Sequence, residues 1–390
     1  MKIKKIKFVK YNSADIAYLI VLFLYATVMV LNESNILESD SFGSIVKFLK
    51  YIVLAFAVTY ILLVYTTLKI NKKVLLIFGI LIGLNIISFI FSGVEINVLL
   101  IVLMTLASTH AKLKNVIITY MFGLITGCCI VFYCASKGII ADVINYRYST
   151  DILSSLFLKS NFYTRHSLGF IHSNQVPFAL MTTYFLIIFW KQDKLSWIIH
   201  AAIEALNAYV FIYCGSRFVF LIIALTTAVC IANSITHKIS WTLPKWCSYI
   251  YFGMAIFSLS LILFYNWIPA SFNIFLNFRI SNAYKVIRTY GFHIIKSNFT
   301  AGTYYGIDGT IIDNGYLMLF MQRGLLFGIA TLALWTHICK IVVNNNKKYI
   351  FLILLMIAIE NFVDYQIISY RFLPLLCIAV HENDDFLTKR

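Results

Sequence analysis

The sequence predicts an all-α membrane protein with about twelve transmembrane helices and two long outer loops. Of its 390 residues, 61% are hydrophobic and only 12% are charged, about half the charged share of an ordinary soluble protein. The apolar residues form long unbroken runs, and lysines recur between alternate runs. We therefore expect lipid to be the solvent and the chain to form a single membrane domain over residues 1–390.

The apolar runs are expected to be helices, because only helices and closed barrels satisfy every backbone group in lipid. The runs also lack the alternating pattern of barrel strands. Several fall short of the roughly 20 residues that span a bilayer, and the fourth and the last are open to a tilted, re-entrant or fused arrangement. In order, the candidate spans are Ile16–Leu31, Tyr51–Leu68, Val74–Ser92, Val98–Ser108, Val116–Ser136, Val176–Trp190, Leu195–Tyr213, Val219–Asn233, Ser248–Trp267, Gly315–His337, Ile350–Val363 and Ile367–Val380.

The placement of lysine predicts the orientation of these spans. Five lysines precede the first span, and every second loop after it is again lysine-bearing. The loop Asn32–Ser44 carries three acidic residues instead. Because basic loops stay in the cytoplasm, we expect an even number of spans with both termini cytoplasmic. The net charge of +16 is then largely a topology signal, and a nucleic-acid partner is not expected.

Two predicted outer loops, 137–175 and 268–312, are longer than simple connections, and long loops in a compact protein are usually functional. Residues 279–290 of the second loop place apolar residues at roughly helical spacing. They predict an amphipathic helix at the outer interface. The same helix could also act as a lid that packs on the bundle, and the two interpretations do not exclude each other.

Arginine is distributed differently from lysine. The chain has eight arginines and 24 lysines, and most of the arginines fall on the predicted outer side. A guanidinium presents a planar, permanently charged fork that binds phosphate oxygens two at a time. This pattern indicates a phosphate or diphosphate held near the outer headgroups, with pairing to carboxylates or lipid phosphates as the alternative. The outer arginines are Arg147, Arg165, Arg217, Arg279 and Arg288, and Arg371 lies near the outer half of the last span.

Three short stretches on the outer side are rich in polar side chains. The first is 165–174, with Arg165, His166, His172 and Asn174, immediately before a span. The second is the turn 214–217, which ends at Arg217, and the third is 313–324, which opens a span with a carboxylate. Asp313 is also a possible helix N-cap.

These stretches resemble motifs of the Wzy-type polysaccharide repeat-unit polymerases of the bacterial envelope, in the O-antigen ligase/polymerase superfamily. An Arg-x-x-Leu-Gly-Phe motif with a following Asn turn is similar to 165–174, and a Gly-Ser-Arg turn is similar to 215–217. A loop arginine, a glycine-bearing stretch and Asp-Asn-x-Tyr-Leu are similar to Arg279, 302–309 and 313–317. The turn at His172 lacks the proline of many members, and the ligase branch often has His where this chain has Asp313.

The resemblance implies a polymerase of undecaprenyl-diphosphate-linked oligosaccharide repeat units, of capsular or O-antigen type, in the bacterial cytoplasmic membrane. The growing glycan would move from its lipid diphosphate to another lipid-linked unit at the outer face. Membrane lipids, a chain-length regulator and a flippase are the further partners we expect. A ligase of the same superfamily and a lipid-linked oligosaccharide flippase or transporter are the alternatives, and a non-catalytic scaffold is the third.

We expect a metal-independent glycosyltransferase with no cofactor, since the outer loops carry no Asp-x-Asp motif. Arginines aimed at the departing diphosphate would supply the largest catalytic effect. Arg165, Arg217 and Arg279 are the candidate clamp. Asp313 is the candidate general base, with His172 and His293 as rivals. The remaining candidate substrate-binding residues are His166, Asn174, Arg288, Asn314 and Tyr316.

Acidic residues inside predicted spans are functional candidates by default. Glu360 and Asp364 lie four residues apart, and therefore on one helical face. We expect them to pair with Arg371 or Arg323, with contact to sugar hydroxyls as the alternative.

Overall fold

The structure, a computed structural model, is mostly helical. It describes residues 13–64, 70–92, 97–148, 162–235, 242–275, 279–295, 314–364 and 366–388. The helices in the first half are α1 (Ser13–Leu31), α2 (Asp40–Val64), α3 (Lys72–Ser92), α4 (Asn97–Ala107) and α5 (Leu113–Ser136). The central ones are α7 (Gln175–Lys191), α8 (Trp197–Cys214), α9 (Arg217–Ile235) and α10 (Ile250–Leu263). The later ones are α11 (Ala270–Phe275), α12 (Arg279–Tyr290), α13 (Gly315–Arg323), α14 (Leu325–Asn344), α15 (Lys348–Glu360), α16 (Leu373–Leu376) and α17 (Asp385–Thr388).

Within the part of the chain that the structure describes, seven helices are long and apolar enough to cross a membrane. They also carry large apolar side chains on their outer faces, as at Leu62 and Trp197, which are 72% and 71% exposed. Such surfaces would be unstable in water and suit the bilayer interior. This confirms the predicted all-α membrane fold at the level of composition and helix length. The seven are α1, α2, α3, α5, α8, α14 and the helix formed by 245–263.

The tightest helix pair is α1 with α5. Gly123 and Gly127 of α5 face α1, and a Cβ added at Gly123 would lie 2.6 Å from the Phe23 carbonyl oxygen. The close approach allows the Thr27 hydroxyl to donate to the Gly123 carbonyl at 3.0 Å. Small residues four apart let membrane helices approach in this way, with interhelical hydrogen bonds adding to the van der Waals contact.

Two predicted spans differ from the structure. The run Gly315–His337 is not one helix: α13 ends at Arg323, Gly324 adopts a left-handed φ of 90°, and α14 begins at Leu325. An L residue other than glycine rarely adopts that φ, so the break depends on Gly324. The run Ile367–Val380 is also not a continuous helix: a 3₁₀ turn lies on each side of the single-turn α16. Pro374 in α16 has no backbone N–H to donate, which disfavours a longer helix through this point.

The predicted loop 137–175 contains regular structure that the sequence analysis does not anticipate. Strands β1 (Ile144–Tyr148) and β2 (Phe162–His166) form an antiparallel pair in which Asn145 lies opposite Arg165. In the second predicted loop, α12 forms a helix with one buried face, made by Ile280, Ala283 and Val286. This is the amphipathic helix that the spacing predicts.

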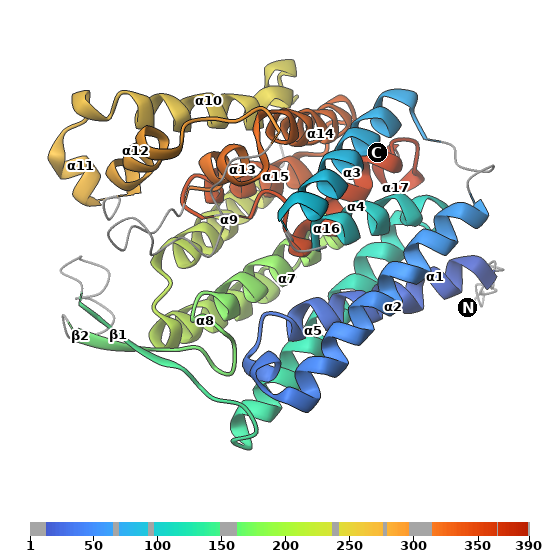
Figure 1. Cartoon of the computed structure of the whole chain (residues 1–390), viewed down its shortest axis with the longest axis horizontal. Coiled ribbons are helices and arrows are strands. Elements are labelled where there is room, and N and C mark those ends of the chain that lie inside the picture. Colours follow the sequence, from blue (N-terminus) through green and yellow to red (C-terminus); the bar gives the residue numbers. More distant parts are fainter. Residues whose placement is uncertain are drawn as a thin grey trace.

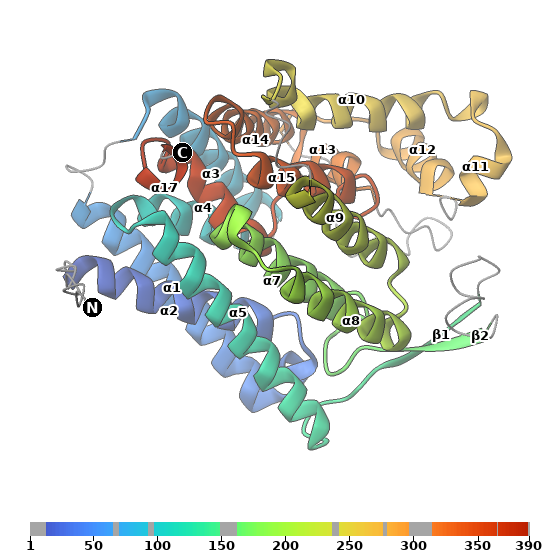
Figure 2. The same cartoon turned by 180° about the vertical axis from the view of Figure 1, so that it is seen from behind.

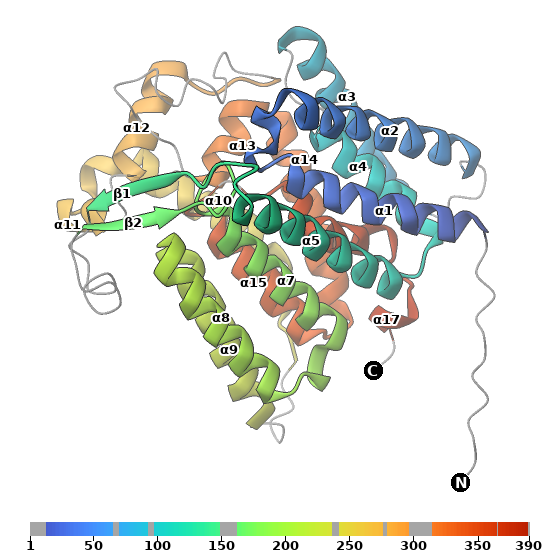
Figure 3. The ribbon, with the colours of Figure 1, turned by 90° about the horizontal axis from the view of Figure 1, so that it is seen from below.

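The two ends of the bundle are different. The β1–β2 pair, α11 and α12 lie toward one end, on the left of Figure 1 and on the right of Figure 2, while the start of α1 and α17 lie toward the other. Figure 3 shows the same separation from below. We call the end that carries β1, β2, α11 and α12 the hairpin end, and the other the terminal end.

At the terminal end, the last residues are held to the α4–α5 connection. The Asp384 carboxylate accepts from the Leu113 backbone N–H at 3.1 Å, and His381 Nε2 lies 3.2 Å from the Ser108 hydroxyl. Burial lowers the pKa of His381 to about 4, although Asp384 opposes the shift. Ser108 is buried and its hydroxyl hydrogen-bonds the Thr105 carbonyl, so this Ser–His–Asp group holds the chain end and does not present a nucleophile.

Candidate functional site

The first candidate stretch folds around Arg165, the fourth residue of β2. The Arg165 Nε donates to the Cys214 carbonyl at 2.7 Å, and another guanidinium nitrogen donates to the Asn174 side chain. The guanidinium is buried. Arg165 therefore ties β2, the start of α7 and the α8–α9 turn together, and this brings two of the three predicted motif stretches into contact.

Asp142 and His166 hold the base of the hairpin. His166 Nδ1 lies 2.8 Å from the Asp142 carboxylate, which also accepts from the Leu168 backbone N–H at 2.7 Å. Partial burial alone would raise the pKa of Asp142, but these hydrogen bonds outweigh it and lower the pKa below its usual value. An ionised Asp142 thus stabilises the turn that follows β2, and the predicted substrate residue His166 has a structural partner.

The predicted turn 214–217 forms the α8–α9 connection. Gly215 closes α8 with a left-handed φ of 64°, and its N–H donates to the Phe211 carbonyl. Arg217 is the first residue of α9 and is half-buried. Because Arg165 holds the Cys214 carbonyl, the position of Arg217 depends on the hairpin residue.

A second arginine lies on the other side of the α7 start. Arg371 is buried, and its guanidinium contacts the Glu33 carboxylate and the side-chain oxygens of Gln175 and Gln366. Tyr370 donates to the same Glu33 at 2.8 Å. Glu33 is therefore the observed partner of Arg371, in place of the predicted Glu360 or Asp364.

Asn174 and Gln175 are consecutive residues that contact different arginines. Asn174 binds Arg165, and Gln175 binds Arg371. The α7 N-terminus thus lies between two buried guanidinium groups, one held by the hairpin and the other by the end of α1. His172 is exposed beside this point, and its Nδ1 accepts from the Asn174 N–H at 3.1 Å.

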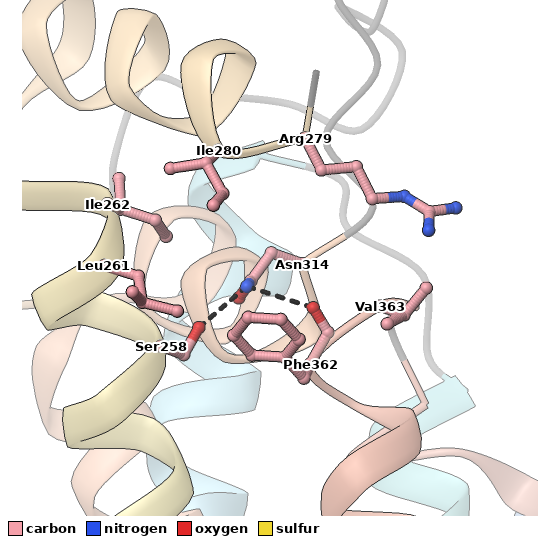
Figure 4. A pocket seen from close by; sticks show the side chains of 8 residues that line it. All are labelled: Ser258, Leu261, Ile262, Arg279, Ile280, Asn314, Phe362 and Val363. Atoms are coloured by element: carbon pink, nitrogen blue, oxygen red, sulfur yellow. Dashed lines mark hydrogen bonds between the residues drawn. The ribbon is translucent and has the colours of Figure 1, made fainter. Parts of the chain in front are cut away.

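The third stretch begins at a junction between α13 and the end of α15. Asn314 caps α13 by accepting from the Leu317 N–H, and its amide donates to the Ser258 hydroxyl at 2.7 Å and to the Phe362 carbonyl at 3.2 Å (Figure 4). The N-cap is therefore Asn314; Asp313, the predicted base, lies outside the described residues. Tyr316 is fully buried and donates to the Ala358 carbonyl at 2.8 Å. Among the predicted binding residues, Asn314 and Tyr316 thus have structural roles.

A narrow pocket opens at this junction. Ser258, Arg279, Asn314 and Phe362 are among its lining residues. Arg279 is the first residue of α12 and is half-buried, and its guanidinium extends away from Ser258 and Asn314 (Figure 4). Arg279 is the only one of the predicted clamp arginines on the wall of this pocket, so the described residues do not place all three in a single cavity.

The other candidates on and after α12 are exposed. Arg288 lies nine residues beyond Arg279, and its guanidinium packs 6.0 Å from the Tyr284 ring centre. His293 is exposed, and its carbonyl accepts from the Leu325 N–H at 2.9 Å at the start of α14.

Two buried ionisable residues, Glu360 and Arg323, are not among the predicted site residues. Glu360 is 0% exposed, and both of its carboxylate oxygens lack a hydrogen-bond partner. Arg323 is 6% exposed, and its Nε and Nη1 lack one too. Both were expected to form ion pairs, and the described part of the chain provides none for either. The rule that an ionisable residue inside a membrane span is functional by default singles out Glu360 from the sequence, and the same rule extends to Arg323.

We compared the chain with known proteins. No protein-family model, curated protein or solved structure shows significant similarity to it.

Proposed function

We propose that this protein polymerises undecaprenyl-diphosphate-linked oligosaccharide repeat units at the outer face of the bacterial cytoplasmic membrane. The observation that carries the proposal is the contact between motif stretches that are far apart in sequence. Arg165, Asn174 and the Cys214 turn meet at the start of α7. Since these two motif stretches resemble motifs of one superfamily, their contact supports a shared site over two unrelated structural turns.

The proposed topology has about twelve spans with both termini in the cytoplasm. The separation of the hairpin end from the termini supports it. On this arrangement the loops 137–175 and 268–312 face outward, and the hairpin end meets the outer headgroups. The lipid-linked substrate would then reach the site from the outer leaflet.

The proposed reaction is a single displacement. The acceptor hydroxyl loses its proton to a general base and attacks the anomeric carbon of the donor glycan. The bond from that carbon to the diphosphate oxygen breaks, and its electron pair leaves with the lipid diphosphate. Asp313 is the proposed base, with His172 and His293 as its rivals.

In this mechanism Arg217 and Arg279 are the proposed diphosphate clamp. Both are half-buried and begin helices. Arg165 has a different role, because it donates hydrogen bonds to the Cys214 carbonyl and the Asn174 side chain. It positions the turn that carries Arg217. Charge-assisted contacts that strengthen as the diphosphate departs would lower the barrier.

A flippase or transporter is the second candidate, and one observation favours it. The chain between Gly315 and Asn344 is two helices broken at Gly324, and interrupted helices are common at the substrate sites of transporters. A ligase of the same superfamily would share the proposed site and differ in its acceptor.

Incubating the purified protein with a defined lipid-linked repeat unit tests these candidates. A ladder of glycans that differ by one unit supports the polymerase. One shifted product on a different acceptor supports the ligase. Movement of the substrate across vesicles without any new product supports the flippase, and each of the last two results contradicts our proposal.

A further inference from the structure

Arg323 occupies an unusual position in the fold. It is the last residue of α13, immediately before the break at Gly324, and it is 6% exposed. Its Nε and Nη1 are buried without a hydrogen-bond partner. A guanidinium cannot lose its proton in a protein, so Arg323 carries a full positive charge in a buried setting.

The contacts that Arg323 does make do not satisfy these donors. The Phe327 ring centre lies 6.0 Å from the guanidinium carbon, and the C-terminal end of α13 favours a positive charge. Neither supplies an acceptor for Nε or Nη1. Burying a charge without a hydrogen-bonded partner costs several kcal/mol, and an orphaned buried donor indicates a missing partner such as an ion.

The other buried arginines show what such a group normally has. Arg371 donates to Glu33, Gln175 and Gln366, and Arg165 donates to Cys214 and Asn174. Arg323 differs from both in that no acceptor in the described structure faces two of its nitrogens.

The surroundings of the break are basic. Helices α12 and α13 share one apolar cluster with Ile262 of α10: Ile280, Ala283 and Val286 belong to α12, and Leu317, Met318 and Met321 belong to α13. The segment after α12 reaches the break, where the His293 and Ile294 carbonyls accept from Leu325 and Leu326. Helix α12 has three basic residues and no acidic one, so this region attracts anions.

We propose that Arg323 binds phosphate oxygens at the α13–α14 break. The ligand chemistry is a phosphate ester or diphosphate at membrane depth. A lipid diphosphate and a phospholipid headgroup both supply it, and identifying the ligand as the diphosphate of the glycan donor rests on the proposed function. The bound anion would accept from Nε and Nη1 and neutralise the buried charge.

Binding to the full-length protein, purified in a maltoside detergent, tests this assignment. The probes are inorganic pyrophosphate and farnesyl diphosphate, and farnesol, which lacks phosphate, is the ligand control. Arg323→Met should weaken the binding of both phosphate probes at least tenfold. The control variant Lys114→Met removes an exposed positive charge from α5, away from the break, and should leave affinity within twofold. Equal affinity in Arg323→Met, or equal binding of farnesol by the wild type, would overturn the assignment.

A variant could lose binding because its fold is destabilised. Melting temperatures measured with and without ligand separate this case from the loss of a binding group. Without ligand, Arg323→Met should melt at or above the wild-type temperature, because it removes an unpaired buried charge. Pyrophosphate should then raise the melting temperature of the wild type and of Lys114→Met but not of Arg323→Met. A ligand-free Arg323→Met that melts well below the wild type would mean that the guanidinium is a structural element.

Competition separates the two phosphate sources. Displacement of pyrophosphate by phosphatidylglycerol identifies a headgroup site, and resistance to it identifies a diphosphate site; both support the assignment to Arg323. A wild type that binds pyrophosphate through Arg323 but makes no glycan would refute only the polymerase. A working polymerase whose pyrophosphate affinity is unchanged by Arg323→Met would refute only this site.

Discussion

At the scale of the residue, five of the described arginines occupy three different environments. Arg165 and Arg371 are buried and hydrogen-bonded to neighbouring groups, which makes them structural. Arg217 and Arg279 are half-buried at helix starts, and Arg323 is buried with orphaned donors. A sequence shows that these residues are arginines, but their partners depend on tertiary contacts such as that between Arg371 and Glu33.

The proposed clamp predicts that Arg217→Lys abolishes most glycan synthesis. Lysine keeps the charge but loses the fork that binds two oxygens at once, so we expect a loss of about 100-fold, typical for removing one donor to developing charge. The measurement is the initial rate of ladder formation by purified protein. Lys114→Gln, at an exposed position of α5, is the matched control and should retain the wild-type rate. A fully active Arg217→Lys would remove the clamp.

The unpaired carboxylate of Glu360 predicts a gain in stability on its removal. Replacing a buried group that has no partner by an apolar one of similar size should stabilise the fold by roughly 1 to 4 kcal/mol. Glu360→Met should therefore raise the melting temperature in detergent, whereas Glu38→Met, at an exposed site, should change it little. A marked fall in the melting temperature of Glu360→Met would show that this carboxylate has a stabilising partner.

At the scale of the element, helix contacts depend on where glycine faces a neighbour. Gly123 lies against α1, while a Cβ added at Gly79 of α3 would meet nothing within 4 Å. Both residues are in long apolar helices, so the sequence alone does not separate them. The structure does, because only Gly123 faces a helix whose backbone lies in contact.

Matched glycine substitutions test this difference. Gly123→Ala should lower stability by about 1 to 3 kcal/mol, since the added methyl overpacks the α1–α5 contact. Gly79→Ala should be neutral or stabilising, because alanine favours a helix interior over glycine. The two melting temperatures, taken in the same detergent, check the prediction. Equal changes in both would contradict the close α1–α5 packing.

The chain end predicts a pH dependence of stability. The pKa of His381 in the folded state is about 4, below the value of about 6.5 expected in an unfolded chain. As the pH falls from about 6.5 towards 4, the unfolded state takes up a proton that the folded state does not, so about 2 to 3 kcal/mol of stability should be lost. Above pH 7 this contribution is fully present.

Melting temperatures at pH 7.5 and pH 5 measure the effect. His381→Phe should flatten the dependence over this range, whereas His110→Gln, at a half-exposed position in the same region, should not. An unchanged dependence in His381→Phe would assign the effect to another group.

At the scale of the whole molecule, the sequence predicts the solvent and the helical class, because both follow from composition and run length. It does not predict the break at Gly324, since a glycine inside an apolar run also occurs in continuous helices such as α3. The β1–β2 pair has strands of only five residues inside a loop, too short for a periodicity signal. Each motif residue can be recognised in the sequence. Only the contacts seen in the structure show which of these residues are structural and which remain candidates for ligand binding.

We propose that glycosyl transfer takes place at the hairpin end, on the side of the membrane opposite the terminal end. The most direct test of this proposal is polymerisation in sealed vesicles of known protein orientation, with the lipid-linked repeat unit supplied to one leaflet. A cysteine introduced at exposed Tyr146 of β1 reports which face carries the hairpin through its labelling by an impermeant reagent. We expect a glycan ladder only when the substrate occupies the leaflet on the labelled side. A ladder formed only from the opposite leaflet would contradict the proposal.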